Sequence, residues 1–208
     1  MRPSYPGAAG APSRITAERV VLLDEAGRAV GEQDKQAAHS TSTPLHLAFS
    51  CYVFDSERRL LVTRRALDKR TFPGAWTNTA CGHPGPGERL LDAVTRRVRE
   101  ELGIGLRHLR IVLPRFRYRA VMANGIIENE MCPVSTALTE DEPVLDPDEV
   151  AATTWVPWDD FSSDVLDGRR EVSPWCLEQV RELALLAADP LEWAAASSAA
   201  LPPAARLG

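Results

Sequence analysis

The stretch TACGHPGPGERLLDAVTRRVREELG, residues 79–103, places a thiol and an imidazole ahead of a glycine- and proline-rich turn and an amphipathic segment. Its apolar residues recur at helical spacing, at Leu90, Leu91, Val94, Val98 and Leu102. Such spacing puts side chains on one face of a helix, and Gly103 stands where glycine commonly ends one. The stretch therefore predicts a turn followed by a helix over 88–103.

Extended segments flank this helix on both sides. Residues 46–55 and 59–65 are rich in β-branched and aromatic side chains and enclose a polar SER, which predicts a β-hairpin. Residues 110–122 and 126–138 enclose an Asn-Gly turn signal and predict a second hairpin. Further predicted elements are a short strand near ATTWVP and helices near WDDFSSDVL and SPWCLEQVRELALLAA. Hairpins mixed with helices, without repeated βαβ units, predict an α+β fold with a mixed sheet and flanking helices.

Composition limits the class of protein. The chain has 208 residues, 44% hydrophobic and 25% charged, with a net charge of −5, which is ordinary for a globular protein and gives no sign of nucleic-acid or membrane binding. Four widely spaced cysteines without a CxxC pair indicate a reduced, cytoplasmic setting. We expect a disordered tail over 1–30, a single catalytic domain over 31–190 and a flexible tail over 191–208. A monomer or weak homodimer is expected.

Two further groups of residues could bind a metal. Glu128 and Glu130, two apart in a predicted strand, point to one face, and their apolar flanks make burial costly unless a cation or a proton is present. His39, His46 and His83 lie close in sequence to other candidate residues. Together the three imidazoles and two carboxylates would form a mixed nitrogen and oxygen site for Mn²⁺ or Zn²⁺, provided that the fold brings them together.

Cys81 and His83 allow three interpretations from the sequence alone. They could be a pair of metal ligands, a nucleophile with its base, or a buried cysteine beside a surface histidine. Likewise, the charged residues of the following helix could form an ordinary solvated face. A glycine-rich loop before a helix that carries several carboxylates can instead form a pocket for Mg²⁺ and a diphosphate.

The order of these residues resembles the Nudix box. The matching positions are Gly82, Glu88, Arg96, Val98, Glu100, Glu101, Gly103 and Ile104. Arg97 departs from the pattern, because it stands where the box has a glutamate. An arginine there suits gripping a diphosphate better than hydrolysing it.

Several further segments narrow the resemblance to one family. They are HLAFS (46–50), LLVTRRALDKRTFPGAWTNTACGHPGPGE (60–88), FRYRA (116–120), ENEMCPV (128–134) and SPW (173–175). In this order and spacing they resemble the type 1 isopentenyl-diphosphate Δ-isomerases, over roughly residues 35–175. The resemblance implies an α/β/α Nudix-type sandwich and an enzyme of isoprenoid biosynthesis. Such an enzyme converts isopentenyl diphosphate to dimethylallyl diphosphate by protonation and deprotonation through a tertiary carbocation.

The resemblance also implies a role for each site residue. Cys81 and Glu130 are expected to be the catalytic acid/base pair, Tyr118 to assist proton transfer, and the ring of Trp175 to stabilise the carbocation. The Mn²⁺ or Zn²⁺ ligands are expected to be His39, His46, His83, Glu128 and Glu130. Diphosphate contacts are expected from Lys35, Arg65, Lys69 and Arg97, and Glu101 is expected to bind Mg²⁺ that bridges to the diphosphate.

Two alternatives remain open at this point. A Nudix hydrolase would cleave nucleoside or prenyl diphosphates, although Arg97, Cys81 and the two glutamates of ENE speak against it. A binding module that has lost catalysis would hold a diphosphate or RNA without turnover and would have little need of Cys81. The hydrolase would release phosphate or a monophosphate, whereas the binding module would bind tightly without forming any product.

Overall fold

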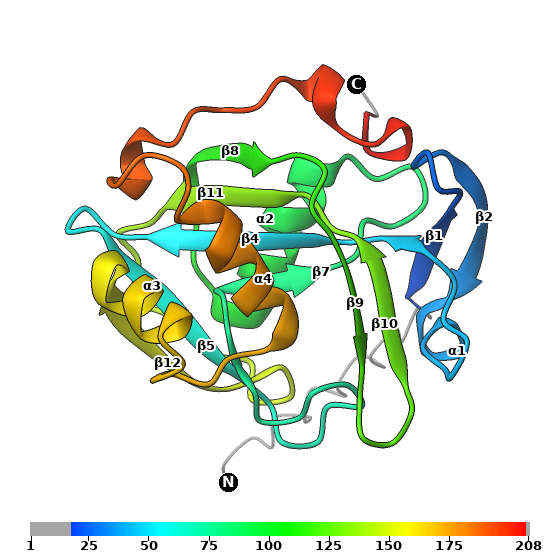
Figure 1. Cartoon of the computed structure of the whole chain (residues 1–208), viewed down its shortest axis with the longest axis horizontal. Helices are drawn as coiled ribbons and strands as arrows, with labels where there is room; N and C mark the ends of the chain where they lie inside the picture. Colours follow the sequence, from blue (N-terminus) through cyan, green and yellow to red (C-terminus); the bar gives the residue numbers. More distant parts are fainter. Residues whose placement is uncertain (1–17, 207–208) are drawn as a thin grey trace, which may run out of the picture.

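The computed structural model describes residues 18–206 as two β-sheets with helices packed around them (Figure 1). One sheet has five strands in the order β2-β1-β3-β10-β9, and the other has seven, with β12-β5-β4-β11-β8 as its main path and β6 and β7 paired to β5 and β4. The strands are β1 Arg19–Leu23, β2 Ala29–Asp34, β3 His46–Leu47, β4 Phe49–Phe54, β5 Arg59–Arg65, β6 Trp76–Thr77, β7 Ala80–Gly82, β8 Arg107–Leu113, β9 Arg117–Val121, β10 Ile127–Met131, β11 Val134–Leu138 and β12 Val150–Pro157. The α-helices are α1 Lys35–Ala38, α2 Leu90–Leu102, α3 Trp158–Leu166 and α4 Pro174–Leu183, followed by 3₁₀ helices at Pro190–Glu192, Ser198–Ala200 and Pro203–Ala205.

Helices cover both faces of the seven-stranded sheet. All six residues of β4 are buried, as expected for a strand covered on both sides. Cys51 and Val53 belong to a core cluster that includes the apolar face of α2, whereas Tyr52 and Phe54 belong to a second cluster with α3 and α4. Alternate side chains of one strand thus face opposite layers. The predicted α+β class and α/β/α sandwich are confirmed.

The predicted helix and first hairpin are present. α2 ends at Gly103, whose φ of 66° is left-handed and whose N–H bonds to the carbonyl of Arg99. Strands β4 and β5 are antiparallel, with Phe54 opposite Leu60. None of the described helices is both long and apolar enough to cross a membrane.

The second predicted hairpin is more divided than expected. β9 and β10 pair antiparallel around the Asn-Gly turn, but β8 and β11 lie in the other sheet. Each long extended segment breaks at a proline, Pro114 or Pro133. Proline has no N–H to give to a sheet ladder, so it favours the point where a chain leaves one sheet for another.

Both predicted tail boundaries need correction. β1 lies wholly inside the segment 1–30 and β2 begins in it, and Val20 and Leu23 are buried in the five-stranded sheet. At the other end Trp193 and Leu201 are buried, and the chain crosses above β8, where Ala196 donates to the carbonyl of Ile111 (Figure 1). Both segments contribute apolar residues to the core. Their flanks are rich in Ala, Ser, Pro and Gly, so the sequence pattern did not indicate this burial. The prediction for residues 1–17 lies outside the described residues, and the single-domain boundary stays a prediction.

Candidate active site

A cavity of about 1210 Å³ lies between the two sheets and α2 and gathers the predicted site residues. Those lining it are Lys35, His39, Arg65, Lys69, Cys81, His83, Arg97, Glu101, Tyr118, Glu128, Glu130 and Trp175. His46 is the one predicted residue outside this lining, because its side chain is fully buried behind it. The fold therefore brings together residues from segments more than a hundred positions apart.

Three histidines surround one carboxylate oxygen. The Nε2 atoms of His83, His46 and His39 lie 3.1, 3.5 and 4.0 Å from Oε1 of Glu130. One ligand atom from each of these four residues lies within 4.8 Å of all the others. Parallel pairing of β3 with β10 sets His46 directly opposite Glu130, while His39 ends α1 and His83 follows β7. Sequence spacing could not show this convergence.

Hydrogen bonds on the far side of two rings make this cluster suitable for a metal. Nδ1 of His39 lies 2.7 Å from the carbonyl of Lys35, and Nδ1 of His46 lies 2.9 Å from the carbonyl of Pro44. A carbonyl can only accept, so each Nδ1 carries a proton, and when the ring is neutral its Nε2 lone pair faces Glu130. Nε2 of His46 is buried without a hydrogen-bond partner. Three imidazole nitrogens and a carboxylate oxygen fit a divalent transition metal or zinc.

Burial and charge act in opposite directions on these groups. Burial lowers the pKa of His83 to about 3, although Glu130 opposes it. Burial also favours the neutral form of Glu130, but the three adjacent histidines outweigh it and hold the pKa of that carboxyl well below its usual range. The carboxylate therefore stays ionised near neutral pH.

Tyr118 links the two glutamates of β10. Its hydroxyl oxygen lies 2.8 Å from an oxygen of Glu128 and 2.8 Å from an oxygen of Glu130. The hydroxyl has a single proton to donate, so the second contact requires a proton on one carboxyl group. Burial, with the neighbouring Glu130 charge, raises the pKa of Glu128, which makes Glu128 the protonated partner. Glu128 lies outside the four-residue cluster, and its role as a metal ligand stays a prediction.

Cys81 presents a protonated thiol to the cavity. It lies in β7, where it pairs with Ser50 of β4, and burial raises its pKa to about 11. Its sulfur donates to Oδ1 of Asn78 at 3.2 Å and lies 3.4 Å from the hydroxyl oxygen of Ser50. The other three cysteines of the chain are buried and unpaired. Cys81 is thus the cysteine that borders the cavity.

Aromatic rings form the inner wall near this thiol. Trp175 is buried at the start of α4, with its ring centroid 5.7 Å from that of Tyr118 and 5.2 Å from that of Phe72. The guanidinium carbon of Arg65 lies 5.6 Å from the Trp175 ring centroid, which is a cation–π geometry. The ring therefore already faces one positive charge in this structure.

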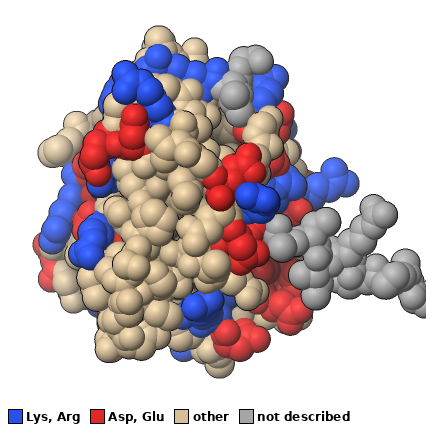
Figure 2. Space-filling model, turned by 90° about the vertical axis from the view of Figure 1, so that its right-hand side faces the viewer, with Lys and Arg blue, Asp and Glu red and all other residues tan. Residues whose placement is uncertain are grey.

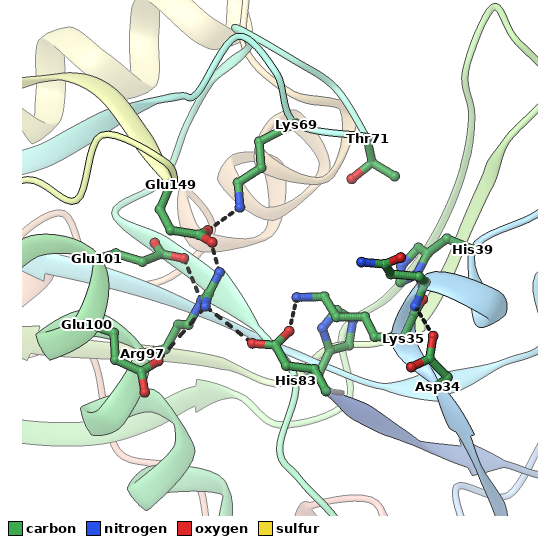
Figure 3. Close-up of polar contacts among 12 residues, drawn as sticks. Asp34, Lys35, His39, Lys69, Thr71, His83, Arg97, Glu100, Glu101 and Glu149 are labelled. Atoms are coloured by element: carbon green, nitrogen blue, oxygen red, sulfur yellow. Dashed lines mark hydrogen bonds and ion pairs between the residues drawn. The ribbon is translucent and has the colours of Figure 1, made fainter. Parts of the chain in front are cut away.

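Basic side chains and carboxylates alternate around Arg97 (Figure 3). Arg97 forms ion pairs with Glu101 at 2.6 Å and with Glu149 at 2.5 Å, and Lys69 also contacts Glu149. Lys35 pairs with Glu18 at 2.5 Å. Burial raises the pKa of Glu101 to about 7, although Arg97 opposes the shift. This end of the cavity offers cations to an anion and a carboxylate to a metal.

Glu88 and Arg96 of the Nudix box stabilise the turn that precedes α2. Glu88 accepts two hydrogen bonds from Arg96, at 2.7 and 2.9 Å, and one from the N–H of Gly85 at 2.8 Å. These contacts fasten the turn to α2 and lower the pKa of Glu88. Gly82 has no room for a side chain, since a Cβ atom would lie 2.8 Å from the ring of Phe49. The turn thereby holds His83 against the cluster.

Comparison with known proteins places the chain in a family. The family pattern described as NUDIX domain matches residues 44–176. A protein named isopentenyl-diphosphate Delta-isomerase from Saccharopolyspora erythraea is 57% identical over 188 residues, covering 90% of this chain and 97% of its own. One of the same name from Mycolicibacterium vanbaalenii is 59% identical over 169 residues, covering 81% and 93%. This chain belongs to the isopentenyl-diphosphate Delta-isomerase family.

Solved structures support the fold of this isomerase family member. DR0079 from Deinococcus radiodurans superposes with a TM-score of 0.63 at 20% identity, covering 79% of this chain and 98% of its own. The MutT protein from Methanosarcina mazei superposes with a TM-score of 0.52 at 18% identity, covering 68% and 96%. At such low identity these two similarities concern the fold alone.

Sequence reasoning missed some residues of the cavity in this family member. Glu149 contacts two predicted diphosphate-binding cations, but the sequence of its acidic loop predicts only a connection between elements. Glu18 gave no signal, because it precedes a strand that the sequence pattern did not predict. Asn78 stands in the quoted segment TNTAC, yet nothing in its spacing marked its contact with Cys81.

Proposed function

We propose that this protein interconverts isopentenyl diphosphate and dimethylallyl diphosphate in isoprenoid biosynthesis. The observation that carries the proposal is that Cys81 and Glu130 border one cavity. A three-histidine cluster lies beside the same cavity, which also contains a group of basic side chains that could bind a diphosphate. Relatives with this activity in their name match nearly the whole chain. The protein is an enzyme of the isomerase class.

Cys81 and Glu130 are proposed as the acid/base pair. The reaction adds a proton to the terminal alkene carbon and removes one from C2, so no net proton is consumed. Such a reaction needs one protonated and one unprotonated group at the start. Burial keeps the thiol of Cys81 protonated, and the surrounding imidazoles keep Glu130 ionised. The hydroxyl of Tyr118, 2.8 Å from Glu130, can pass a proton to or from that carboxylate.

Trp175 and its neighbours are proposed to surround the tertiary carbocation. Trp175 and Tyr118 are nearly fully buried, so they exclude the water that would trap a carbocation. The face of an indole ring attracts positive charge, and the guanidinium of Arg65 over this ring supports the proposal. In the proposed reaction the diphosphate draws Arg65 toward itself and leaves the ring to the substrate.

The four predicted cations are proposed to bind the diphosphate. Arg97 and Lys69 face the same region of the cavity from α2 and from the β5–β6 loop (Figure 3). Arg65 and Lys35 approach it from β5 and α1. Glu101 is proposed to hold Mg²⁺, which would neutralise diphosphate charge when bound. Mn²⁺ or Zn²⁺ is proposed for His39, His46, His83 and Glu130, with Glu128 adjoining through Tyr118.

Arg97 also explains why hydrolysis is not the proposed reaction. Its guanidinium occupies the helix position at which the Nudix box supplies a carboxylate, and it is nearly buried among four glutamates, Glu18, Glu100, Glu101 and Glu149. The positive charge of the Arg97 guanidinium would repel a metal ion from this position, whereas it would attract a phosphate oxygen. We further propose that the enzyme acts in the cytoplasm as a monomer or weak homodimer, without nucleic acid or membrane.

The decisive test is incubation with isopentenyl diphosphate and Mg²⁺ in deuterated water. The expected product is dimethylallyl diphosphate carrying deuterium in a methyl group, detected by NMR. Cys81→Ala and Glu130→Gln should each abolish conversion while circular dichroism shows intact folding. Release of phosphate without isomer would indicate a hydrolase, and tight binding without any turnover would indicate a binding module. Either result would overturn the proposal.

A further inference from the structure

Asn78 occupies a fully buried position between β6 and β7, two elements that border the cavity. Its neighbours fix the backbone of this connection to the central sheet. The hydroxyl of Thr63 donates to the carbonyl of Asn78 at 2.8 Å. The hydroxyl of Thr79 donates to the carbonyl of Leu61 at 2.6 Å and accepts a hydrogen bond from the N–H of Val53 at 2.8 Å. The side chain of Asn78 therefore starts from a rigid base.

The amide oxygen of Asn78 receives hydrogen bonds from three directions. Thr77 donates its hydroxyl at 2.8 Å, Cys81 its thiol at 3.2 Å, and Trp175 its indole N–H at 3.2 Å. Two of these donors belong to residues of the proposed reaction, and they come from different elements, β7 and α4. A single oxygen atom thus connects the thiol to the indole ring.

The orientation of this amide is fixed by its partners. Its Nδ2 donates to the carbonyls of Cys51 at 3.1 Å and Ala80 at 2.9 Å, and neither carbonyl can act as a donor. The indole N–H of Trp175 can only donate, so the oxygen must face it. A flipped amide would set donor against donor and acceptor against acceptor. Both polar atoms of the Asn78 side chain are used, and the flipped orientation satisfies neither.

We propose that Asn78 is a positioning residue that fixes the thiol of Cys81 and the ring of Trp175 in one geometry relative to the substrate. The inference rests on the proposed function, because it gives these two side chains their roles. Asn78 acts through them, since its own amide is consumed by protein contacts.

Outside Asn78, the polar groups of Trp175 and Cys81 have few partners. Ring contacts of Trp175 with Phe72 and Tyr118 restrict its position, but its indole N–H is its polar anchor. The thiol of Cys81 has a second neighbour in Ser50, whose oxygen already receives an N–H from Gln179 at 2.9 Å. The Ser50 hydroxyl lies 3.4 Å from the sulfurs of both Cys81 and Cys132 and can donate its proton to either, whereas Asn78 Oδ1 accepts the thiol proton of Cys81.

The test compares two substitutions of Asn78 with a matched control at the same hub. Asn78→Ser keeps a small polar group for one carbonyl but is too short to reach the thiol and the indole. Asn78→Asp keeps the acceptor oxygen, and its second oxygen, placed between two carbonyls, takes up a proton in order to remain buried. Thr77→Val removes the third donor to the same oxygen and the contact of Thr77 with the Ser173 hydroxyl at 2.8 Å, but no hydrogen bond of Cys81 or Trp175.

Steady-state isomerisation and inorganic diphosphate binding are measured for each variant in the presence of Mg²⁺. Displacing a reacting group by about 1 Å can cost on the order of 10²-fold in rate, so Asn78→Ser should lower kcat about 10²-fold. Its KM and its affinity for inorganic diphosphate should change less than about threefold, because the cations are untouched. Asn78→Asp should recover kcat to within about tenfold of wild type. Thr77→Val should lower the melting temperature and keep kcat.

The outcomes separate this inference from the proposed function. An inactive wild-type enzyme would overturn the proposed function itself. With an active wild type, a normal kcat in Asn78→Ser, a raised KM at unchanged kcat, or an equal loss in Thr77→Val would overturn the positioning role. If Asn78→Ser does not fold, the kcat of Asn78→Asp tests the positioning role instead. A loss of kcat of about 10²-fold in Asn78→Asp would show that the acceptor oxygen does not position Cys81 and Trp175.

Discussion

Replacing His46 by glutamine should remove most of the stabilisation that a divalent metal gives this protein. His46 is fully buried, its Nε2 has no hydrogen-bond partner, and this atom faces Glu130 at 3.5 Å. A metal held by the three histidines and Glu130 would supply that partner. Glutamine keeps a polar group of similar volume but cannot place a nitrogen lone pair at the same point.

The size of the effect follows from the number of ligands. A four-ligand zinc site contributes about 10–16 kcal/mol of binding, so one ligand of four accounts for about 3 kcal/mol, or about 10²-fold in affinity. Metal at about 100 times the wild-type Kd stabilises the folded state by about 2.7 kcal/mol, but the same concentration stabilises the variant by only about 0.4 kcal/mol. For a chain of this length the melting temperature should rise by about 5–11 °C in the wild type and about 1 °C in the variant.

The assay is thermal unfolding with and without Mn²⁺ or Zn²⁺ after removal of metal by a chelator. Each protein is compared with itself, so any baseline loss of stability in His46→Gln does not affect the result. His108→Gln is the matched control, because His108 is exposed on β8 away from the cavity. Equal metal-induced shifts in wild type and His46→Gln, or a lost shift in the control, would refute the assignment of the cluster as a metal site.

Three further substitutions test other parts of the structure. Gly103→Ala should lower the free energy of unfolding by about 1–3 kcal/mol in urea, because φ is 66° and a Cβ would lie 3.2 Å from a backbone oxygen; an unchanged midpoint would contradict this. Trp193→Ala should cost about 3–5 kcal/mol, and Leu185→Ala, an exposed control, less than about 0.5 kcal/mol. Arg97→Glu should weaken inorganic diphosphate binding at least about tenfold in calorimetry, whereas Arg99→Glu on the exposed face should not; equal affinities would exclude Arg97 from the anion site.

Local patterns predicted the elements with strong periodicity. α2 combines a four-residue apolar repeat with Gly103, and both features act within a few residues, so sequence alone locates the helix and its end. β1 and β2 were missed because four of the six residues in β2 are exposed and the hairpin shows little alternation. Its burial depends on Leu201 and on the C-terminal chain that crosses above it, which are contacts over more than 150 residues.

The site residues were predicted by family resemblance more than by physics. Two carboxylates two apart in a strand do point to one face, and Tyr118 confirms this by contacting both Glu128 and Glu130. No local rule, however, could bring His46 to Glu130, since 84 residues separate them and their meeting depends on strand pairing. Asn78 escaped notice for the same reason, because its importance lies in a contact with Trp175 on α4.

The position of the cavity follows from how the chain passes between the two sheets. β3 continues into β4 and β10 continues into β11, and these two continuous segments run parallel to each other across both sheets. Where the two segments cross from one sheet to the other, the N–H of Ala48 donates to the carbonyl of Met131 and the N–H of Ser50 to the carbonyl of Pro133. The two segments therefore change direction together. Side chains just before the turn, His46 and Glu130, remain in the five-stranded sheet, while Cys81 is paired to β4 just after it. Diverging sheets open a space that side chains of both can enter, as in open α/β folds where ligands bind where strands separate. The His39, His46, His83 and Glu130 cluster and the thiol of Cys81 therefore reach the same opening from different sheets, an arrangement that suits the proposed addition of a proton at one carbon and its removal from another.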